Sequence, residues 1–322
     1  MDKIPNIANI AVPFYIVMII IEMVWAKRNA PALYDPRDLL TSLSMAVGNF
    51  IAGVLAAAFV ITTSFAVYEY RLFDLPNHWS IWILSFILID LAYYAVHRLR
   101  HRLRWFWASH VNHHSSQSFN LSIALRQSWT GFFSLSFAYN WPFVILGFAP
   151  QMLFICAGLN TLYQFWQHTQ VIKRMPRWFE YIFVTPSHHR VHHANNARHL
   201  DSNYGGTLII WDRMFGTFSE ERDDEPLRFG LVRQLGGYNL LWNIFHEWVS
   251  IAQDIWRAPL RYKLGYFFGP PGWSHDGSRE TSDMIKARWA ESERTATAIS
   301  NNVAPSNVGS TSDLITASAV GG

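Results

Sequence analysis

The chain contains little charge and almost no cysteine. Only 15% of its 322 residues are charged and half are hydrophobic, whereas about 25% of a typical soluble domain is charged. The single cysteine, Cys156, excludes an internal disulfide and a cysteine-based metal site. The net charge is only +3 and no motif combines basic with aromatic residues, so nucleic acid is not an expected partner. This composition favours a membrane protein over a soluble one.

Long uncharged stretches account for the low charge. A helix needs roughly 20 apolar residues to cross a bilayer, and three segments satisfy this length: Ile10–Ala26, Leu43–Val67 and Trp79–Val96. The first lacks an obvious small-residue cleavage site and is interpreted as a retained anchor. A fourth apolar segment, Trp129–Phe165, contains Gly147 and Pro150. It predicts a helical hairpin that enters and leaves the membrane on the same side.

Basic residues in the loops predict an orientation. They follow the first span at Lys27, Arg28 and Arg37, and the third span at Arg98, Arg100, Arg102 and Arg104. Because cytoplasmic loops are enriched in Lys and Arg, both loops and the chain from Gln167 onward are expected to be cytoplasmic. The membrane would be the inner membrane of a bacterium or the endoplasmic reticulum of a eukaryote.

Histidine is unusually frequent, and nearly all fourteen histidines fall on the predicted cytoplasmic face. Three groups have regular spacing: HxxxH, HxxHH and a second HxxHH. Residues at i, i+3 and i+4 share one face of a helix, so each group is expected to present its rings to one point. The members are His97 and His101, then His110, His113 and His114, then His189, His192 and His193.

Eight such imidazoles are too many for one catalytic ion, which needs about three protein ligands. Imidazole suits Zn, Cu, Fe and Ni, and the Glu-x-x-His pattern of carboxylate di-iron bundles is absent. The pattern therefore predicts an all-histidine pair of ions. Neutral ligands leave a high positive charge on the ions, which fits chemistry with O₂.

Other polar residues are candidates for the same site. His168 is a predicted ninth ligand, with a structural hydrogen bond as the alternative. Asp90 lies two helical turns before His97 and is expected to orient an imidazole, unless it only packs helices together. His188 and Asn203 are weaker candidates for supporting contacts. The remaining histidines are expected to have ordinary structural or interfacial roles: His78, His199, His246 and His275.

The order of these groups resembles the fatty acid hydroxylase and sterol desaturase superfamily over about residues 75–220. The motifs that carry the resemblance are Asp90…Tyr94…His97-Arg98, Trp107…His110…His113-His114-Ser115, Pro186…His189…His192-His193 and Asn203-Tyr204-Gly205. Within it, the alkylglycerol monooxygenase group and its bacterial relatives are the most similar. The matching segments are Gln164–Thr169, Thr185–His193, Leu208–Phe218 and Gly269–Trp273.

The resemblance implies a di-iron enzyme that uses O₂ and an electron donor to oxidise a lipid. The alkylglycerol monooxygenase group further implies hydroxylation next to an ether oxygen, with tetrahydrobiopterin as the reductant. Sterol desaturases, sterol and fatty-acyl hydroxylases and bacterial aminolipid hydroxylases share the motifs. The ligand set does not separate hydroxylation from desaturation, because both begin with abstraction of hydrogen at one site.

The expected fold is an all-α, multi-pass membrane bundle of three spans and a hairpin, with a cytoplasmic helical cap that carries the ion pair. The predicted domains are spans at 1–74, a catalytic domain at 75–290 and a disordered tail at 291–322. A helix over Tyr238–Trp256 lies either at the lipid interface or buried in the cap. The lipid tail is expected between the spans and the hairpin, and its head group near Trp211, Arg213 or that helix.

Two other functions remain open at this point. A zinc-dependent membrane hydrolase would need one ion and a nearby carboxylate base, but no HExxH motif occurs. A metal transporter or sensor would place its ligands in the middle of the bilayer, whereas these lie at the ends of spans.

Overall fold

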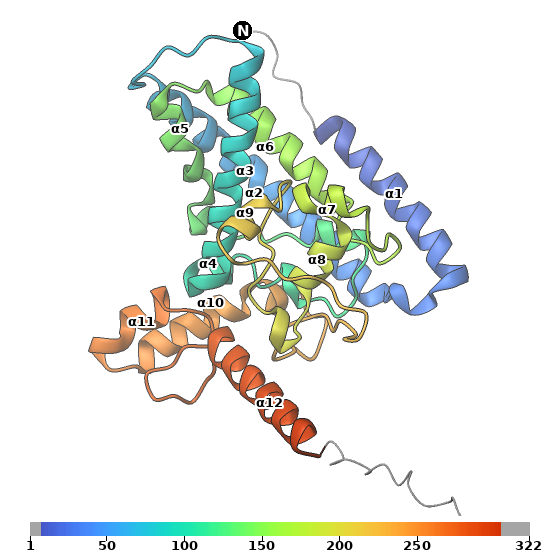
Figure 1. Ribbon diagram of the computed structural model, residues 1–322. Helices are drawn as coiled ribbons and strands as arrows, with labels where there is room; N and C mark the ends of the chain where they lie inside the picture. The colour runs from blue at the N-terminus through green and yellow to red at the C-terminus, as the bar shows by residue number, and fades with distance from the viewer. Residues whose placement is uncertain (1–7, 304–322) are drawn as a thin grey trace, which may run out of the picture.

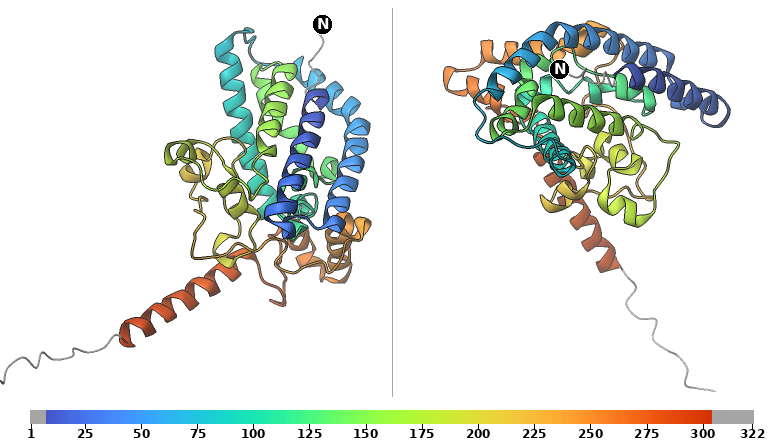
Figure 2. Two further views of the ribbon diagram at one scale, coloured as in Figure 1. Left: turned by 90° about the vertical axis from the view of Figure 1, so that its right-hand side faces the viewer. Right: turned by 90° about the horizontal axis from the view of Figure 1, so that it is seen from above.

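The computed structural model describes residues 8–303, and within that range the regular structure is helical. Two isolated β-bridges, Phe183 with Leu208 and Ala194 with Phe229, join loops near the histidines. Four long helices run alongside one another, and most of the shorter helices, though not α5 (Trp141–Leu146), lie toward one end of them (Figures 1 and 2). The all-α prediction is confirmed for the described residues.

The long helices carry the apolar segments. They are α1 (Ala8–Asn29), α2 (Pro36–Tyr68), α3 (Trp79–Arg102) and α6 (Pro150–Phe165). Residues Pro31–Tyr68 and Trp79–Arg102 are long and apolar enough to cross a membrane. The second of the three predicted spans lies within the first of these segments, and the third within the other. Helix α1 contains the remaining one, and its crossing of a membrane stays a prediction.

The starts of two long helices follow from local side-chain caps. Asp35 accepts hydrogen bonds from the backbone N–H groups of Arg37 and Asp38 at the start of α2. His78 does the same for Ser80 at the start of α3. Such caps satisfy N–H groups that have no partner within the helix. The role of His78 is therefore to cap a helix, at the end of α3 remote from the other histidines.

The predicted hairpin differs from expectation in its first arm. That arm consists of two 3₁₀ turns, Gly131–Ser134 and Ser136–Asn140, followed by the short helix α5 (Trp141–Leu146). The chain then reverses at Gly147, whose φ of +108° and close approach to the carbonyl of Phe73 require a glycine. Only the return arm, α6, is a long helix.

A small apolar core holds this hairpin against α3. Ile89 of α3 packs with Val144, Phe148, Leu153 and other buried residues of the hairpin. The packing places the end of α6 beside the end of α3, where the histidines lie.

The elements at the histidine end of the long helices, here called the cap, include seven α-helices and several 3₁₀ turns among the described residues. Its α-helices are α4 (Arg104–Ala108), α7 (Arg177–Ile182), α8 (Pro186–His193), α9 (Ile210–Met214), α10 (Leu240–Arg257), α11 (Lys263–Phe268) and α12 (Ser282–Val303). Its 3₁₀ turns include His113–Ser115, Leu121–Leu125 and Ala197–His199. Helix α10 buries one face and exposes the other, so an entirely buried helix is excluded for 238–256.

Helix α12 corrects the prediction of a disordered tail from Glu291. It continues to Val303 and projects away from the bundle in Figure 2. Helix α12 contains four Ala, two Glu and two Arg, and these residues favour a helix even where little of it is buried. The rest of the predicted tail, 304–322, lies outside the described residues.

Candidate metal centre

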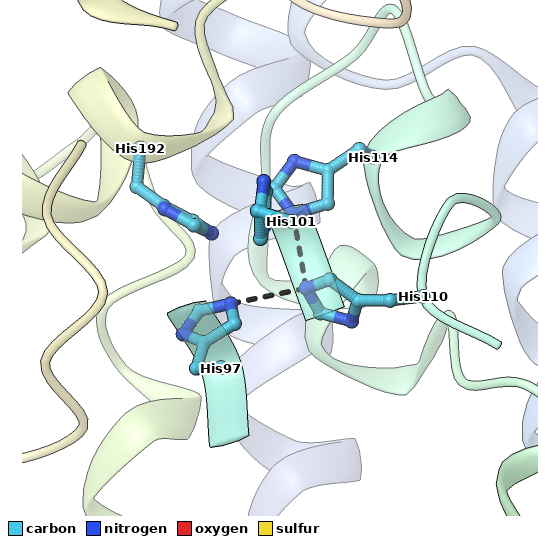
Figure 3. A group of neighbouring side chains, drawn as sticks. All are labelled: His97, His101, His110, His114 and His192. Carbon is cyan, nitrogen blue, oxygen red and sulfur yellow. Dashed lines mark hydrogen bonds between the residues drawn. The ribbon is translucent and has the colours of Figure 1, made fainter. Parts of the chain in front are cut away.

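Nine buried histidines form two adjacent groups that could each hold an ion. One group contains five residues and the other four, and within each group the ligand nitrogens all lie within 4.8 Å of one another. The first group, drawn in Figure 3, is His97, His101, His110, His114 and His192. The second is His113, His168, His189 and His193. The structure thus brings together all nine histidines that the sequence singled out, including His168.

The elements that carry these residues are only partly those predicted. His97 and His101 lie one turn apart at the end of α3, and the last group lies on α8, as expected. The middle group does not lie on a helix. It occupies a turn and a 3₁₀ segment after α4.

The expectation that each sequence group points to a single ion is also wrong. His113 belongs to a different site from His110 and His114, and His192 is separated from His189 and His193. Successive residues on a helix are about 100° apart, so a helix beside two ions directs adjacent histidines to different ones. The 4–5 division of ligands is therefore a product of how the segments pack.

The nitrogen geometry fits an ion at each site. The Nε2 atoms of His97 and His114 lie 3.0 and 3.2 Å from that of His110. In the second group, Nε2 of His168 is 3.3 Å from His113 and 2.9 Å from His189. Two nitrogens that each lie about 2.1 Å from one ion are about 3.0–3.4 Å apart. These contacts match the edges of a coordination polyhedron.

Two buried nitrogens support the same interpretation. The Nε2 atoms of His101 and His192 have no hydrogen-bond partner among residues 8–303, although both rings are buried. A buried polar atom without a partner is costly. An ion at the first site would satisfy both atoms.

Backbone carbonyls orient four of the nine clustered rings. Nδ1 of His97 and of His192 donate to the carbonyls of Tyr204 and Ser202, each at 2.9 Å. Nδ1 of His113 and of His168 donate to the carbonyls of Arg126 and Gln164, at 3.2 and 3.1 Å. A proton held on Nδ1 leaves the lone pair on Nε2, which is the atom that faces the ion.

Burial favours the neutral form of seven of the clustered histidines. It lowers the pKa of His168 to about 4, and it lowers the pKa of six others well below the usual value. The latter are His110, His113, His114, His189, His192 and His193. A metal binds the neutral imidazole, so these rings are ready to coordinate at neutral pH.

Asp212 supports the site and was missed by sequence reasoning. Its buried carboxylate accepts hydrogen bonds of 2.7 Å from the backbone N–H groups of Tyr204 and Gly205 and from the Thr217 hydroxyl. Tyr204 in turn offers its carbonyl to His97. Its position in the largely apolar stretch 208–218 could have indicated this role, because a buried carboxylate needs hydrogen-bond partners.

Asp90 was expected to orient an imidazole, but it bonds to a loop that supports the histidines. It accepts hydrogen bonds from the backbone of Thr207 and Leu208 and from Nε1 of Trp211, at 2.7, 3.0 and 2.9 Å. Asn160 also donates to it. None of these partners is a histidine, so Asp90 holds the loop after Tyr204.

His188 and Asn203 hold helix α8 and the adjacent loop. The ring of His188 accepts the N–H of Thr185 and caps α8. Asn203 donates to the carbonyls of His188 and Ser219, and its φ of +55° suits asparagine. His199, His246 and His275 each bond to a neighbouring side chain or carbonyl and belong to neither group.

Two buried charged residues connect the site to the first helices. Arg126 donates to Asp38 of α2 at 3.1 Å and to Asn243 of α10 at 3.0 Å. Glu22 of α1 accepts the N–H of Leu121 at 2.8 Å and the hydroxyl of Thr169, which follows His168. From the sequence, Arg126 was a candidate either to hold the histidine segments together or to line the site, and Glu22 had no predicted role.

A pocket opens onto both ion sites. Its lining includes three histidines of the first group, His101, His114 and His192, and one of the second, His193. The rest of the wall is mostly apolar and includes Trp107, Leu200, Leu231, Val232 and Pro271. Trp211 and Arg213, predicted near a head group, instead bond to Asp90 and to the carbonyl of Glu180.

Comparison with known proteins agrees with this site. Residues 82–217 match the model of the fatty acid hydroxylase family. This part of the chain is a fatty acid hydroxylase domain. All nine clustered histidines fall within it, so the resemblance noted from the motifs is confirmed.

Relatives of the hydroxylase domain extend the match to most of the chain. The chain is 37% identical to alkylglycerol monooxygenase of Homo sapiens over 85% of its length, and 37% identical to that of Xenopus tropicalis over 84%. Ornithine lipid hydroxylase OlsE of Rhizobium tropici is 27% identical over 61% of the chain. The matches cover 61%, 60% and 60% of these relatives, so the chain spans about three fifths of their length. No solved structure matches the chain.

Proposed function

We propose that the protein is a membrane-bound, di-iron, O₂-dependent monooxygenase that hydroxylates a C–H bond of a lipid. The observation that carries the proposal is the pair of buried imidazole groups, five and four, beside an apolar pocket. The names of the relatives support a lipid substrate, because they include alkylglycerol monooxygenase and ornithine lipid hydroxylase.

The residues fit iron in both groups. Imidazole binds iron well, and nine neutral ligands leave the ions strongly electrophilic. His97, His101, His110, His114 and His192 would hold one ion, and His113, His168, His189 and His193 the other. When bound, the irons supply the activation of O₂ for attack on a C–H bond.

The pocket walls indicate which part of a lipid reaches the site. The lining offers few free polar groups: Asp201 pairs with Arg102 at 3.2 Å, and Asn195 donates to the carbonyls of Phe229 and Leu231. A polar group of a substrate would lose its hydrogen bonds with water in this pocket, whereas a hydrocarbon chain has no such bonds to lose. We therefore place an alkyl chain between Trp107 and Val232, in contrast to the entry between spans and hairpin predicted from sequence.

An ether lipid is the preferred substrate, with tetrahydrobiopterin as the reductant that the alkylglycerol monooxygenase resemblance implies. Hydroxylation beside the ether oxygen gives a hemiacetal, which separates into a fatty aldehyde and an alcohol. An aminolipid hydroxylase, a sterol or fatty-acyl hydroxylase or a desaturase is the alternative on the same site. The cap and the ions would lie on the cytoplasmic face, in the inner membrane or the endoplasmic reticulum.

A zinc hydrolase is less well supported. It needs a carboxylate free to act as a base near one ion. Among the described residues that line the pocket, Asp201 is the carboxylate, and it is engaged by Arg102 and lies 3.5 Å from Nδ1 of His101. The nine-ligand set also exceeds what one zinc needs.

The experiment is a labelled turnover assay on anaerobically purified, iron-loaded protein in lipid nanodiscs. Alkylglycerol, ¹⁸O₂ and tetrahydrobiopterin are added, and the aldehyde is trapped by immediate reduction. The expected product is a fatty alcohol with one ¹⁸O, together with about two irons per chain. Oxidation of ornithine lipid or a sterol alone would redirect the substrate assignment, and hydrolysis without ¹⁸O incorporation would reject the oxygenase.

A further inference from the structure

Helix α10 exposes an apolar stripe, whereas its buried face is mixed and carries Asn243 and His246 as well as Ile244 and Ile251. A helix on a soluble protein has its polar residues on the exposed face. The exposed side chains of α10 recur every three or four residues and form an outer stripe, defined as Leu241, Trp242, Phe245, Val249, Ala252 and Trp256. Trp256 is 86% exposed. A stripe this apolar is unfavourable in water.

The inner face of α10 is fixed by charge and hydrogen bonds. The buried guanidinium of Arg104 donates to Glu247 at 2.6 Å, to Ser250 at 2.8 Å and to Asp254 at 2.7 Å. Arg279 donates to the same Asp254. Because these contacts set the rotation of the helix, the outer stripe cannot turn inward to bury itself.

The outer stripe continues the apolar surface of the proposed spans. Phe59 of α2 packs on Phe132 at 5.4 Å between ring centroids, and the adjacent Phe133 lies 6.4 Å from Trp248 of α10. The ring centroids of Trp129 and of Phe245 in α10 also lie 6.4 Å apart. Phe132 and Phe133 are themselves exposed. One apolar surface therefore runs from α2 to α10.

Helix α11 and the turn before it extend this surface. Leu260, Leu264 and Phe268 are exposed, Leu260 at 83%. The exposed Arg257 and Arg261 lie beside them. Arginine and tryptophan, with an apolar body and a polar end, suit the boundary between hydrocarbon and head groups. In Figure 1, α10 and α11 lie across the cap end of α3 and not along it.

We propose that α10 and α11 lie in the plane of the membrane, with the outer stripe inserted among the lipid head groups at the cap end of the spans. The continuity with α2 favours a bilayer surface over a second protein, because one lipid layer would cover both. This location would hold the cap and its pocket at the membrane surface. The inference rests on the proposed membrane location and is independent of the reaction.

The test measures the depth of single fluorescent probes in lipid nanodiscs. Cys156 is replaced by alanine, and one cysteine is introduced per variant and labelled with an environment-sensitive dye. Val249→Cys and Leu241→Cys report on the outer stripe, two turns apart. Leu55→Cys, on the exposed face of α2, is the control for the membrane interior, and Ser292→Cys, on exposed α12, is the control for water.

The two stripe probes are expected to be quenched most by lipids with a spin label near the head group and little by aqueous iodide. The Leu55 probe should respond to labels deep in the chains, and the Ser292 probe to iodide alone. Iodide quenching of the stripe equal to that at Ser292 would overturn the proposal. So would a stripe shielded from both quenchers, which a protein partner or second copy would produce. If Leu55 also fails to meet lipid, the membrane location itself is rejected.

Discussion

His113 shows how little of a residue's role is set by its neighbours in the chain. It is adjacent to His114, yet the two rings belong to different ion sites. A carbonyl from Arg126, thirteen residues away, orients its ring. The proposal of two ions therefore makes a specific claim about this one side chain.

Replacing His113 by alanine should leave three ligands in the second site and all five in the first. We expect the metal content of purified protein to fall from about two ions per chain toward one. Lipid oxidation should fall by more than the roughly 10–100-fold that loss of a ligand's supporting contact costs. Elemental analysis of matched preparations measures the first effect, and His275→Asn is the control. Two ions retained in the alanine variant would remove His113 from the ligand set.

Asp212 provides a test of the contacts behind the ligands. Asp212→Asn weakens the hold on the backbone of Tyr204 and Gly205, so the carbonyl that orients His97 becomes less fixed. Metal affinity is expected to fall about 10–100-fold, as measured by competition with a chelator. The exposed Asp224, which pairs with Arg222, gives the control Asp224→Asn. Equal affinities in the two variants would contradict the support role.

Val232 tests the placement of the alkyl chain. Val232→Trp narrows the pocket, and the loss of one or two methylenes of contact should lower kcat/KM for long chains about 10–200-fold. Short chains should be less affected, and the metal content should stay unchanged. A uniform chain-length profile in the variant would place the substrate elsewhere.

At the scale of elements, buried polar contacts hold the cap to the long helices. Arg126 is the clearest case, since its guanidinium joins a 3₁₀ segment to Asp38 of α2 and Asn243 of α10. Its carbonyl also accepts a hydrogen bond from the ring of His113, one of the clustered histidines. Damage to this contact should therefore affect both folding and metal binding.

Arg126→Leu leaves the carboxylate of Asp38 buried without its cation. Breaking a buried ion pair in this way costs about 3–5 kcal/mol, which should appear as a lower denaturation midpoint in detergent. The double variant Arg126→Leu, Asp38→Asn should recover part of the loss, because the uncompensated charge is gone. Arg222→Leu, at an exposed ion pair, should leave the denaturation midpoint nearly unchanged, because solvent screens such pairs. A double variant no more stable than the single one would contradict the electrostatic explanation.

At the scale of the whole molecule, most of the short helices lie toward one end of the long helices (Figure 2), and the nine clustered histidines belong to that end. Two of these helices are long and apolar enough to cross a membrane. The loop 69–78 lies at the opposite end of α3 from His97 and His101, so the proposed orientation puts that loop and the cap on opposite sides.

Cysteines at Asp74 and at Ser292 should therefore be labelled from opposite sides of the membrane. Asp74 is exposed in the loop before α3, and Ser292 is exposed on α12. With a membrane-impermeant maleimide on intact cells, the expected result is labelling of Asp74→Cys alone, and of Ser292→Cys only after the membrane is opened. Labelling of both from one side would reject the two-sided arrangement.

The sequence by itself determined which residues carry the chemistry. The spacing of His97, His101 and the two HxxHH groups predicted eight imidazoles, and His168 was a separate ninth candidate. The structure gathers all nine. The apolar lengths also predicted α2 and α3, because helix periodicity and membrane thickness are local constraints. Neither depends on which segments finally meet.

Tertiary structure alone decided how the ligands divide and what supports them. The 4–5 split depends on α8 and the 110–114 turn lying between two sites, and Asp212 acts on His97 through a loop brought in from residue 204. The outward apolar face of α10 likewise depends on Arg104, 143 residues from Glu247. Long-range packing sets these relations, and the spacing of residues along the chain does not encode it.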